Sequence, residues 1–184
     1  MKKGTIITII VAVVVLGDIG ITYNGLVTRN VAVDSQWAQV ETQYQRRVDL
    51  IPNLVNAVKG VMKQETSVFG ALADARTHYL GATGTDEKAK AASEVESAYA
   101  QLLVVMENYP TLKSADNVLA LQSQIEGTEN RISVERGRFN DAVREYNLKV
   151  TKFPSALIAK LFGFDSKAYF QSAAGADVAP EVQF

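Results

Sequence analysis

The sequence contains no cysteine and a single histidine, His78, among its 184 residues. Without cysteine, the chain has no disulfide, no thiolate nucleophile and no thiolate metal ligand. One histidine is too few for a di-iron site built on paired Glu-x-x-His motifs within one chain. Acidic and basic residues nearly balance at 20 and 19, whereas nucleic-acid-binding domains carry a basic excess. We therefore expect no metal, no other cofactor and no nucleic-acid partner.

Catalytic motifs are also missing, since the sequence has no glycine-rich phosphate loop, no nucleophile elbow and no Walker-type motif. Glu126 and Glu129 stand one helical turn apart, and such a carboxylate pair can bind a metal or act as acid and base. His78 lies near the end of a predicted helix, and we expect it to be exposed and without a partner. We expect no enzyme, with a hydrolase that uses the two glutamates as the least favoured alternative.

The N-terminus carries a membrane signal. Lys2 and Lys3 precede an apolar run that extends from Gly4 to Tyr23 with Asp18 as its single charge. That run reaches the length of about 20 residues that a membrane-spanning helix needs. A cleaved signal peptide is the alternative, but no Ala-x-Ala cleavage site follows the run. We therefore predict an uncleaved single-pass anchor over residues 1–23.

The charges around this run predict its orientation. Lys2 and Lys3 precede the anchor and only Arg29 follows it closely, so the positive-inside rule keeps the N-terminus in the cytoplasm. The protein would then sit in the inner membrane of a bacterium with its body on the periplasmic side. Asp18 is near the outer end of the run, where it can reach headgroups and water, and we interpret it as part of the anchor.

Beyond residue 23, apolar residues recur every three or four positions, as expected for amphipathic helices. Pro52 is expected to kink the first of them without ending it. The first helix is much longer than the second, so part of its apolar stripe lacks a partner, and we expect a homo-oligomer. The fold class is all-α: an antiparallel up-down-up bundle with a short C-terminal helix. The predicted helices span residues 25–79, 86–109, 114–153 and 156–162, within a bundle over residues 24–170 and before a flexible tail over residues 171–184.

Several charged and polar residues fall where facing helices meet, and we interpret them as a buried polar layer that sets the register of the bundle rather than as a catalytic set. Glu65 interrupts an apolar stripe and should find an arginine or another polar partner. The predicted layer consists of Arg46, Arg47, Glu65, Arg76, Glu129, Asn130 and Arg131.

Two segments near the C-terminus leave alternatives open. The run from Ala156 to Phe162 either lies on a membrane surface or, as we prefer, caps the open end of the bundle. The chain ends in Val182, Gln183 and Phe184, an apolar-x-apolar terminus of the kind that PDZ domains capture by strand addition. A PDZ-bearing envelope protease is a plausible partner, and packing of the tail on a bundle is the alternative.

Several strings after the anchor are specific enough to indicate a family. They include Arg46-Arg47, Asp49-Leu50-Ile51-Pro52-Asn53-Leu54-Val55, Glu107-Asn108-Tyr109-Pro110, Gly127-Thr128-Glu129-Asn130-Arg131-Ile132, Arg138-Phe139-Asn140, Tyr146-Asn147 and Tyr169-Phe170. With these strings the chain resembles the LemA family. The resemblance implies a bacterial membrane-anchored helical bundle without an established activity, and a family member tied to building magnetosome membranes implies a role in membrane organisation. Family descriptions often place the body in the cytosol, the reverse of the orientation that the charges predict.

These patterns lead to one functional hypothesis and one alternative. The leading hypothesis is a non-enzymatic, membrane-anchored coiled-coil scaffold that self-associates and organises envelope proteins or membrane. The alternative is an adaptor that presents its C-terminal tail, ending at Phe184, to a protease or signalling partner.

Overall fold

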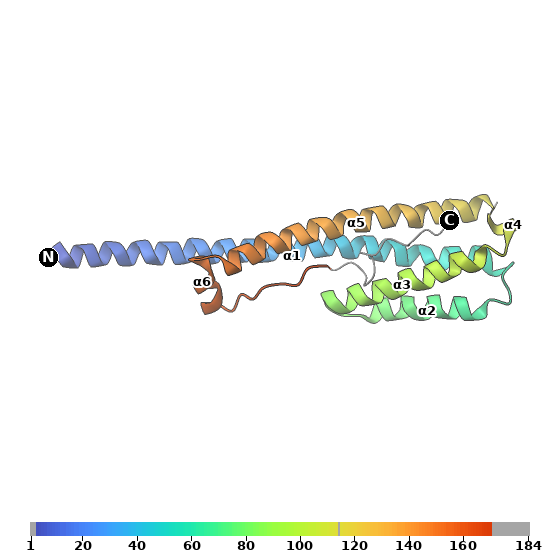
Figure 1. Cartoon of the computed structure of the whole chain (residues 1–184), viewed down its shortest axis with the longest axis horizontal. Helices are drawn as coiled ribbons and strands as arrows, with labels where there is room; N and C mark the ends of the chain where they lie inside the picture. The colour runs from blue at the N-terminus through green and yellow to red at the C-terminus, as the bar shows by residue number, and fades with distance from the viewer. Residues whose placement is uncertain (1–2, 114, 171–184) are drawn as a thin grey trace, which may run out of the picture. The chain divides into compact units, whose positions relative to one another are not determined.

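The computed structural model describes residues 3–113 and 115–170, which are mostly helical and contain no strand (Figure 1). This confirms the predicted all-α class. The elements are α1 (Lys3–Lys59), α2 (Thr66–Gly81), α3 (Thr85–Met106), α4 (Pro110–Lys113), α5 (Asp116–Thr151) and α6 (Ser155–Leu161).

The chain divides into two compact units, and both take residues from α1 and α5. The terminal unit comprises Met1–Gln36 and Arg136–Phe184, and the central unit comprises Trp37–Glu135.

The central unit is a bundle in which α1, α2, α3 and α5 share one core. The predicted apolar stripes supply it: Val40, Tyr44, Val48, Leu102 and Ile125 are all buried. The helices α2 and α3 form an antiparallel hairpin, joined by a turn at Gly84, whose φ of 78° is accessible to glycine at little cost.

The prediction of one helix from Gly25 to Tyr79 is wrong, because α1 ends at Lys59 and the chain turns back into α2. Gly60, directly after the last helical residue, has low helix propensity. Folding back buries Leu72 and Tyr79 inside the chain, and burying a large apolar side chain contributes about 1.5–3 kcal/mol. Pro52, by contrast, lies inside α1 as predicted.

The turn after Lys59 removes the reason for which a homo-oligomer was expected. The α1 stripe that was expected to lack a partner is buried within the single chain, at Val40, Val48, Ile51 and Val58 in the central unit. An unpaired stripe therefore no longer supports self-association, which needs a different surface.

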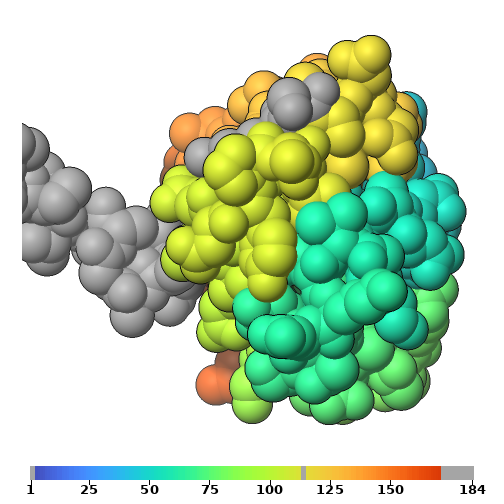
Figure 2. Space-filling model, turned by 90° about the vertical axis from the view of Figure 1, so that its right-hand side faces the viewer, coloured from blue at the N-terminus to red at the C-terminus, as the bar shows by residue number. Residues whose placement is uncertain are grey.

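The end of the central unit is closed by the α1–α2 connection and by α4. Figure 2 shows this end, with the connection in teal and α4 and the start of α5 in yellow-green and yellow. The amides of Val61 and Met62 both donate to the Val58 carbonyl at 3.0 Å, which satisfies the end of α1. In the connection, Glu65 accepts a hydrogen bond of 3.1 Å from the Tyr109 hydroxyl.

The terminal unit begins with the apolar part of α1. Among the described residues, α1 is the one helix long and apolar enough to cross a membrane, and its apolar window is not buried by any other part of the unit. Side chains such as Ile7, Val13 and Leu16 are exposed, as expected of a segment whose solvent is lipid.

Beyond this segment, α5 and α6 pack along α1. Val33, Phe139, Val143 and Tyr146 are buried, as the stripes predict. Phe153, the last residue of the helix predicted over residues 114–153, is 83% exposed, because α5 ends at Thr151 and the chain turns into α6.

Residues 164–170 return along α5 as an extended segment, here called the strap. Asn147 bonds both backbone groups of Lys167, donating to its carbonyl and accepting from its amide, each at 2.9 Å. Asn140 does the same for Phe170, at 3.1 and 2.7 Å. The Phe170 ring meets Phe139 edge-on at 6.4 Å, so the strap is held by polar and apolar contacts together.

Candidate functional site

The most elaborate polar cluster of the central unit is built on Arg47, whose side chain is 4% exposed. The guanidinium donates to Thr128 Oγ1 at 3.1 Å and to Glu96 Oε1 at 3.1 Å, and it also pairs with Glu129. Thr128 in turn donates to the Ile125 carbonyl at 2.6 Å. One arginine thus links α1 to α3 and α5, and each of its three guanidinium nitrogens donates a hydrogen bond within the protein.

The other residues of the predicted polar layer are spread out rather than gathered around Arg47. Glu65 bonds Tyr109 in the α1–α2 connection. Arg76 on α2 is half-buried, and its Nε has no hydrogen-bond partner among the described residues. Arg46, Asn130 and Arg131 are exposed.

Sequence reasoning paired Arg47 with Glu129 in one layer but missed Glu96 and Thr128. Glu96 follows the buried Val95, at the edge of the α3 stripe, where a carboxylate looks like a solvated side chain. Thr128 was named only within a string of the family resemblance, although its hydroxyl bonds the buried guanidinium. The sequence does offer one indication, because a buried charge such as that of Arg47 needs several hydrogen-bond partners.

The carboxylate pair of the hydrolase hypothesis is not assembled as a site. Glu129 is bound to Arg47, and Glu126 is exposed on the next face of α5. Over residues 3–113 and 115–170, no three His, Asp or Glu side chains are grouped so that they could hold a metal ion.

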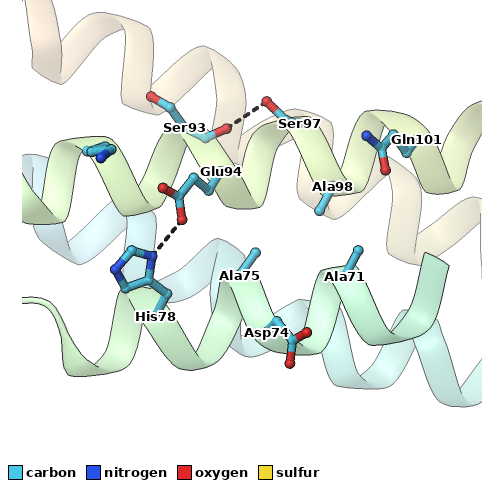
Figure 3. Close-up of a pocket in the computed structure, with 10 residues that line it drawn as sticks. Ala71, Asp74, Ala75, His78, Ser93, Glu94, Ser97, Ala98 and Gln101 are labelled. Carbon is cyan, nitrogen blue, oxygen red and sulfur yellow. Dashed lines mark hydrogen bonds and ion pairs between the residues drawn. The ribbon is translucent and has the colours of Figure 1, made fainter. Parts of the chain in front are cut away.

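A groove of about 690 Å³ runs between α2 and α3 (Figure 3). Its walls carry small side chains, and the charged groups at its edges have both signs. His78, which was expected to have no partner, pairs through Nδ1 with Glu94 Oε2 at 2.6 Å across this groove. The sequence could not show this pair, because it depends on the α2–α3 hairpin. The lining residues are Ala71, Asp74, Ala75, His78, Lys90, Ser93, Glu94, Ser97, Ala98 and Gln101.

The surroundings of two tyrosines in the central unit raise the pKa of their hydroxyl groups. Burial, assisted by the charge of Glu126, raises the pKa of Tyr99 to about 12 even though the nearby Arg47 charge acts the other way. Burial and the charge of Glu41 raise the pKa of Tyr79 as well. Both hydroxyls thus stay neutral near neutral pH, which suits core residues and not general bases.

The predicted terminal features are only partly within the described residues. Lys3 is exposed at the first residue of α1, and Asp18 is exposed at a hollow of about 490 Å³ that Lys149 and Lys152 also line. Lys2 and the C-terminal Val182, Gln183 and Phe184 lie outside the residues that the structure describes, as does the whole predicted tail over residues 171–184.

Comparison with known proteins gives one family and a consistent set of relatives. The model of the LemA family matches residues 36–184. Magnetosome proteins MamQ 2 and MamQ 1 of Paramagnetospirillum magneticum are each 26% identical over 198 residues, which cover 94% of this chain and 73% of the relative. Magnetosome protein MamQ of Magnetospirillum gryphiswaldense is 26% identical over 181 residues, covering 84% of this chain and 66% of the relative.

Proposed function

Because the chain belongs to the LemA family, we propose that it is a non-enzymatic, membrane-anchored scaffold that self-associates and organises envelope proteins or membrane. The N-terminal apolar helix and the magnetosome relatives suggest association with a membrane. The scaffold activity and the self-association are the proposal.

The observation that carries the proposal is the construction of α1. The helix runs without a break from Lys3 to Lys59, so the apolar segment and the first helix of the central unit are one element. Any partner bound by the central unit is thereby tied to the membrane by the chain of α1 itself, with no separate linker segment between the two.

The use of the polar side chains also favours a binding role over catalysis. Arg47 bonds both Glu129 and Thr128, and the raised pKa of Tyr99 keeps its hydroxyl protonated near neutral pH. An active site would instead aim such groups into a cavity. The surface feature that remains is the groove between α2 and α3.

We assign self-association to this groove, with a second copy of the chain as its occupant. The small side chains of Ala71 and Ser97 allow another helix to approach closely. Asp74 and Lys90 provide one charge of each sign on the same patch. In a two-fold contact each acid can meet the other copy's base, which makes the patch self-complementary.

The test fills the groove on one face of α2 and leaves the opposite face as control. Ala71→Trp places a large side chain in the groove, and Ala73→Trp places the same side chain on an exposed position outside it. We expect the first variant to shift the molar mass measured by light scattering in detergent towards the monomer, and the second to leave it unchanged. A wild-type chain that is monomeric at all concentrations, or equal behaviour of both variants, would count against a self-associating scaffold.

The proposed orientation places the central unit on the periplasmic side of the inner membrane. Because the chain has no cysteine, Ser123→Cys introduces a unique thiol on an exposed position of α5. An impermeant maleimide should label it in intact spheroplasts as well as after lysis, with the cysteine-free parent as the blank. Labelling only after lysis would place the unit in the cytosol and make a cytosolic scaffold the better proposal.

A further inference from the structure

Helix α6 has two apolar faces, and only one of them is used inside the protein. Ile158 and Ala159 are buried against Leu26 of α1, with Ile19 and Val150 packed beside them. For residues 156–162 the sequence favoured a cap on the open end of the bundle, and the contacts of the buried face are with α1, α5 and Phe164 of the terminal unit. On the other side Leu157 is 65% exposed and Leu161 is 74% exposed.

The exposed face is extended by the residues on either side of α6. Phe153, just before the helix, is 83% exposed, and Phe162, just after it, is 48% exposed. Four large apolar side chains thus gather around a helix of seven residues. A surface cap in water would carry polar groups on this side, as the outer face of an amphipathic helix does.

The position of α6 along α1 identifies what covers this face. Its buried face contacts Ile19, which belongs to the apolar run, and Leu26, which follows it. Tyr23, between these two, stacks near Phe162 at 4.9 Å and Phe164 at 5.8 Å (ring centroids). The rings of Tyr23, Phe162 and Phe164 therefore lie beside the end of the membrane-length segment, where aromatic belts of membrane proteins meet the headgroups.

Two lysines in and next to α6 also suit a position at the lipid headgroups. Lys152 precedes the helix and Lys160 lies within it, and both are exposed. Lysines beside apolar side chains can extend their charged ends to the headgroups while the aliphatic stems stay in the apolar layer. Figure 1 shows α6 and its flanking turns beside α1 in the terminal unit.

We propose that α6 is an interfacial helix, with Phe153, Leu157, Leu161 and Phe162 inserted at the boundary between the headgroups and the acyl chains of the bilayer that α1 crosses. The segment then serves as a second membrane contact of the same chain, and the strap ties it back to α5. A helix of this kind holds the tilt and rotation of the α1 anchor relative to the bilayer. The proposal goes beyond the scaffold function and does not depend on self-association.

The experiment uses the cysteine-free chain, reconstituted at one copy per lipid nanodisc, with single spin labels. The labels replace exposed side chains at Leu157→Cys and Leu161→Cys, so the packed face of α6 stays intact. The measurement is the ratio of collision rates with oxygen, which concentrates in lipid, and with a water-soluble nickel chelate. We expect this ratio at both positions to be several-fold higher than for a label in water.

Two further labels on α1 calibrate the scale. Leu16→Cys lies in the apolar run and is 68% exposed, and Val31→Cys lies beyond the run and is 57% exposed. Ratios at 157 and 161 between those two references support the proposal. Ratios equal to that at Val31 would place α6 in water and overturn it.

A second copy of the chain is the competing occupant of this face. Discs that hold two labelled chains distinguish it, because dipolar broadening between labels at position 157 would show that two α6 helices meet. Broadening at 157, together with a ratio in single-copy discs that matches Val31, would replace the bilayer by a second copy. The Ala71→Trp variant should give the same α6 ratios as the parent, so a failure of self-association is distinguishable from a failure of the α6 proposal.

Discussion

At the scale of single residues, the buried charge of Arg47 links α1 to α3 and α5 in the central unit. Its guanidinium is almost completely shielded, whereas the partner side chains Glu96 and Glu129 keep contact with solvent, at 28% and 52% exposed. Removing the arginine leaves two carboxylates that water can reach. Removing the carboxylates leaves a charge that water cannot reach, and that is the more costly defect.

This asymmetry predicts a ranking of variants. The double variant Glu96→Gln/Glu129→Gln should destabilise the protein by about 3–5 kcal/mol, and Arg47→Met by about 1–3 kcal/mol, the cost of lost hydrogen bonds to partners that rehydrate. Arg46→Met, next to it and exposed, is the control and should be near neutral. Thermal unfolding followed by circular dichroism measures the order, and an Arg47→Met variant less stable than the double variant would contradict it.

The half-buried tyrosine Tyr99 predicts a loss of stability at alkaline pH. Its pKa rises from 10.0 in the unfolded chain to about 12 in the folded protein, chiefly through burial. Between these values the folded state holds a proton that the unfolded state has released, so stability is full below pH 10 and falls as the pH rises towards 12. Melting temperatures of the parent should decline over this window.

Tyr99→Phe tests the assignment. It removes the titrating group, so the decline should become shallower. Its hydroxyl has no hydrogen-bond partner among the described residues, so the substitution should cost little at pH 7. An unchanged alkaline decline in Tyr99→Phe would show that another group is responsible.

At the scale of elements, the strap illustrates how a helix can bind an extended segment by matching repeats. Asn140 and Asn147 stand two turns apart on α5, about 10.5 Å at 1.5 Å per residue. Lys167 and Phe170 stand three residues apart in an extended chain, about 10 Å at 3.3 Å per residue. The two distances agree, so each asparagine amide can satisfy one residue's N–H and C=O together. These asparagines lie in the strings that carry the family resemblance, and the strap supplies a physical reason for them.

The strap predicts a local effect of one substitution. Asn147→Ala should leave the Lys167 amide without its acceptor and raise its hydrogen-exchange rate by roughly tenfold or more, since a lost hydrogen bond costs on the order of 1–3 kcal/mol. The melting temperature should change little, because the strap lies outside the helical core. Asn117→Ala, exposed at the other end of α5, is the control. Exchange at Lys167 that is equal in both variants would show that Asn147 does not hold the strap.

At the scale of the whole molecule, the apolar start of α1 belongs to the terminal unit, whereas the buried core from Val40 onwards belongs to the central unit. Side chains from Ile6 to Leu16 are exposed, whereas the central core is supplied by residues from Val40 onwards. Membrane insertion and bundle stability should therefore respond to different parts of the chain.

Deletion of residues 1–17 tests this separation. The truncated chain should lose integral membrane behaviour and become extractable by alkaline carbonate, because the remaining apolar run is too short to span a bilayer. Its melting temperature should stay within a few degrees of the parent in the same detergent, because the deleted side chains pack on no other part of the terminal unit. A loss of helical structure on deletion would show that the apolar segment is needed for folding.

The sequence by itself determined what depends on local pattern. The three- and four-residue spacing of apolar side chains predicted the helices and most of their buried faces, and the apolar run from Gly4 to Tyr23 predicted the membrane-length segment. The continuation of the first helix through Pro52 was predictable for the same reason. These properties follow from single-helix geometry and need no knowledge of the partner helix.

The tertiary structure decided what depends on which helices meet. The α1–α2 turn after Lys59 forms because folding back buries Leu72 and Tyr79 against other helices, a gain that periodicity within one helix cannot show. The same hairpin brings His78 to Glu94 and creates the groove between them. The partners of a buried charge such as Arg47, and the free face of α6, were decided in the same way, because desolvation and burial depend on contacts between residues far apart in the chain.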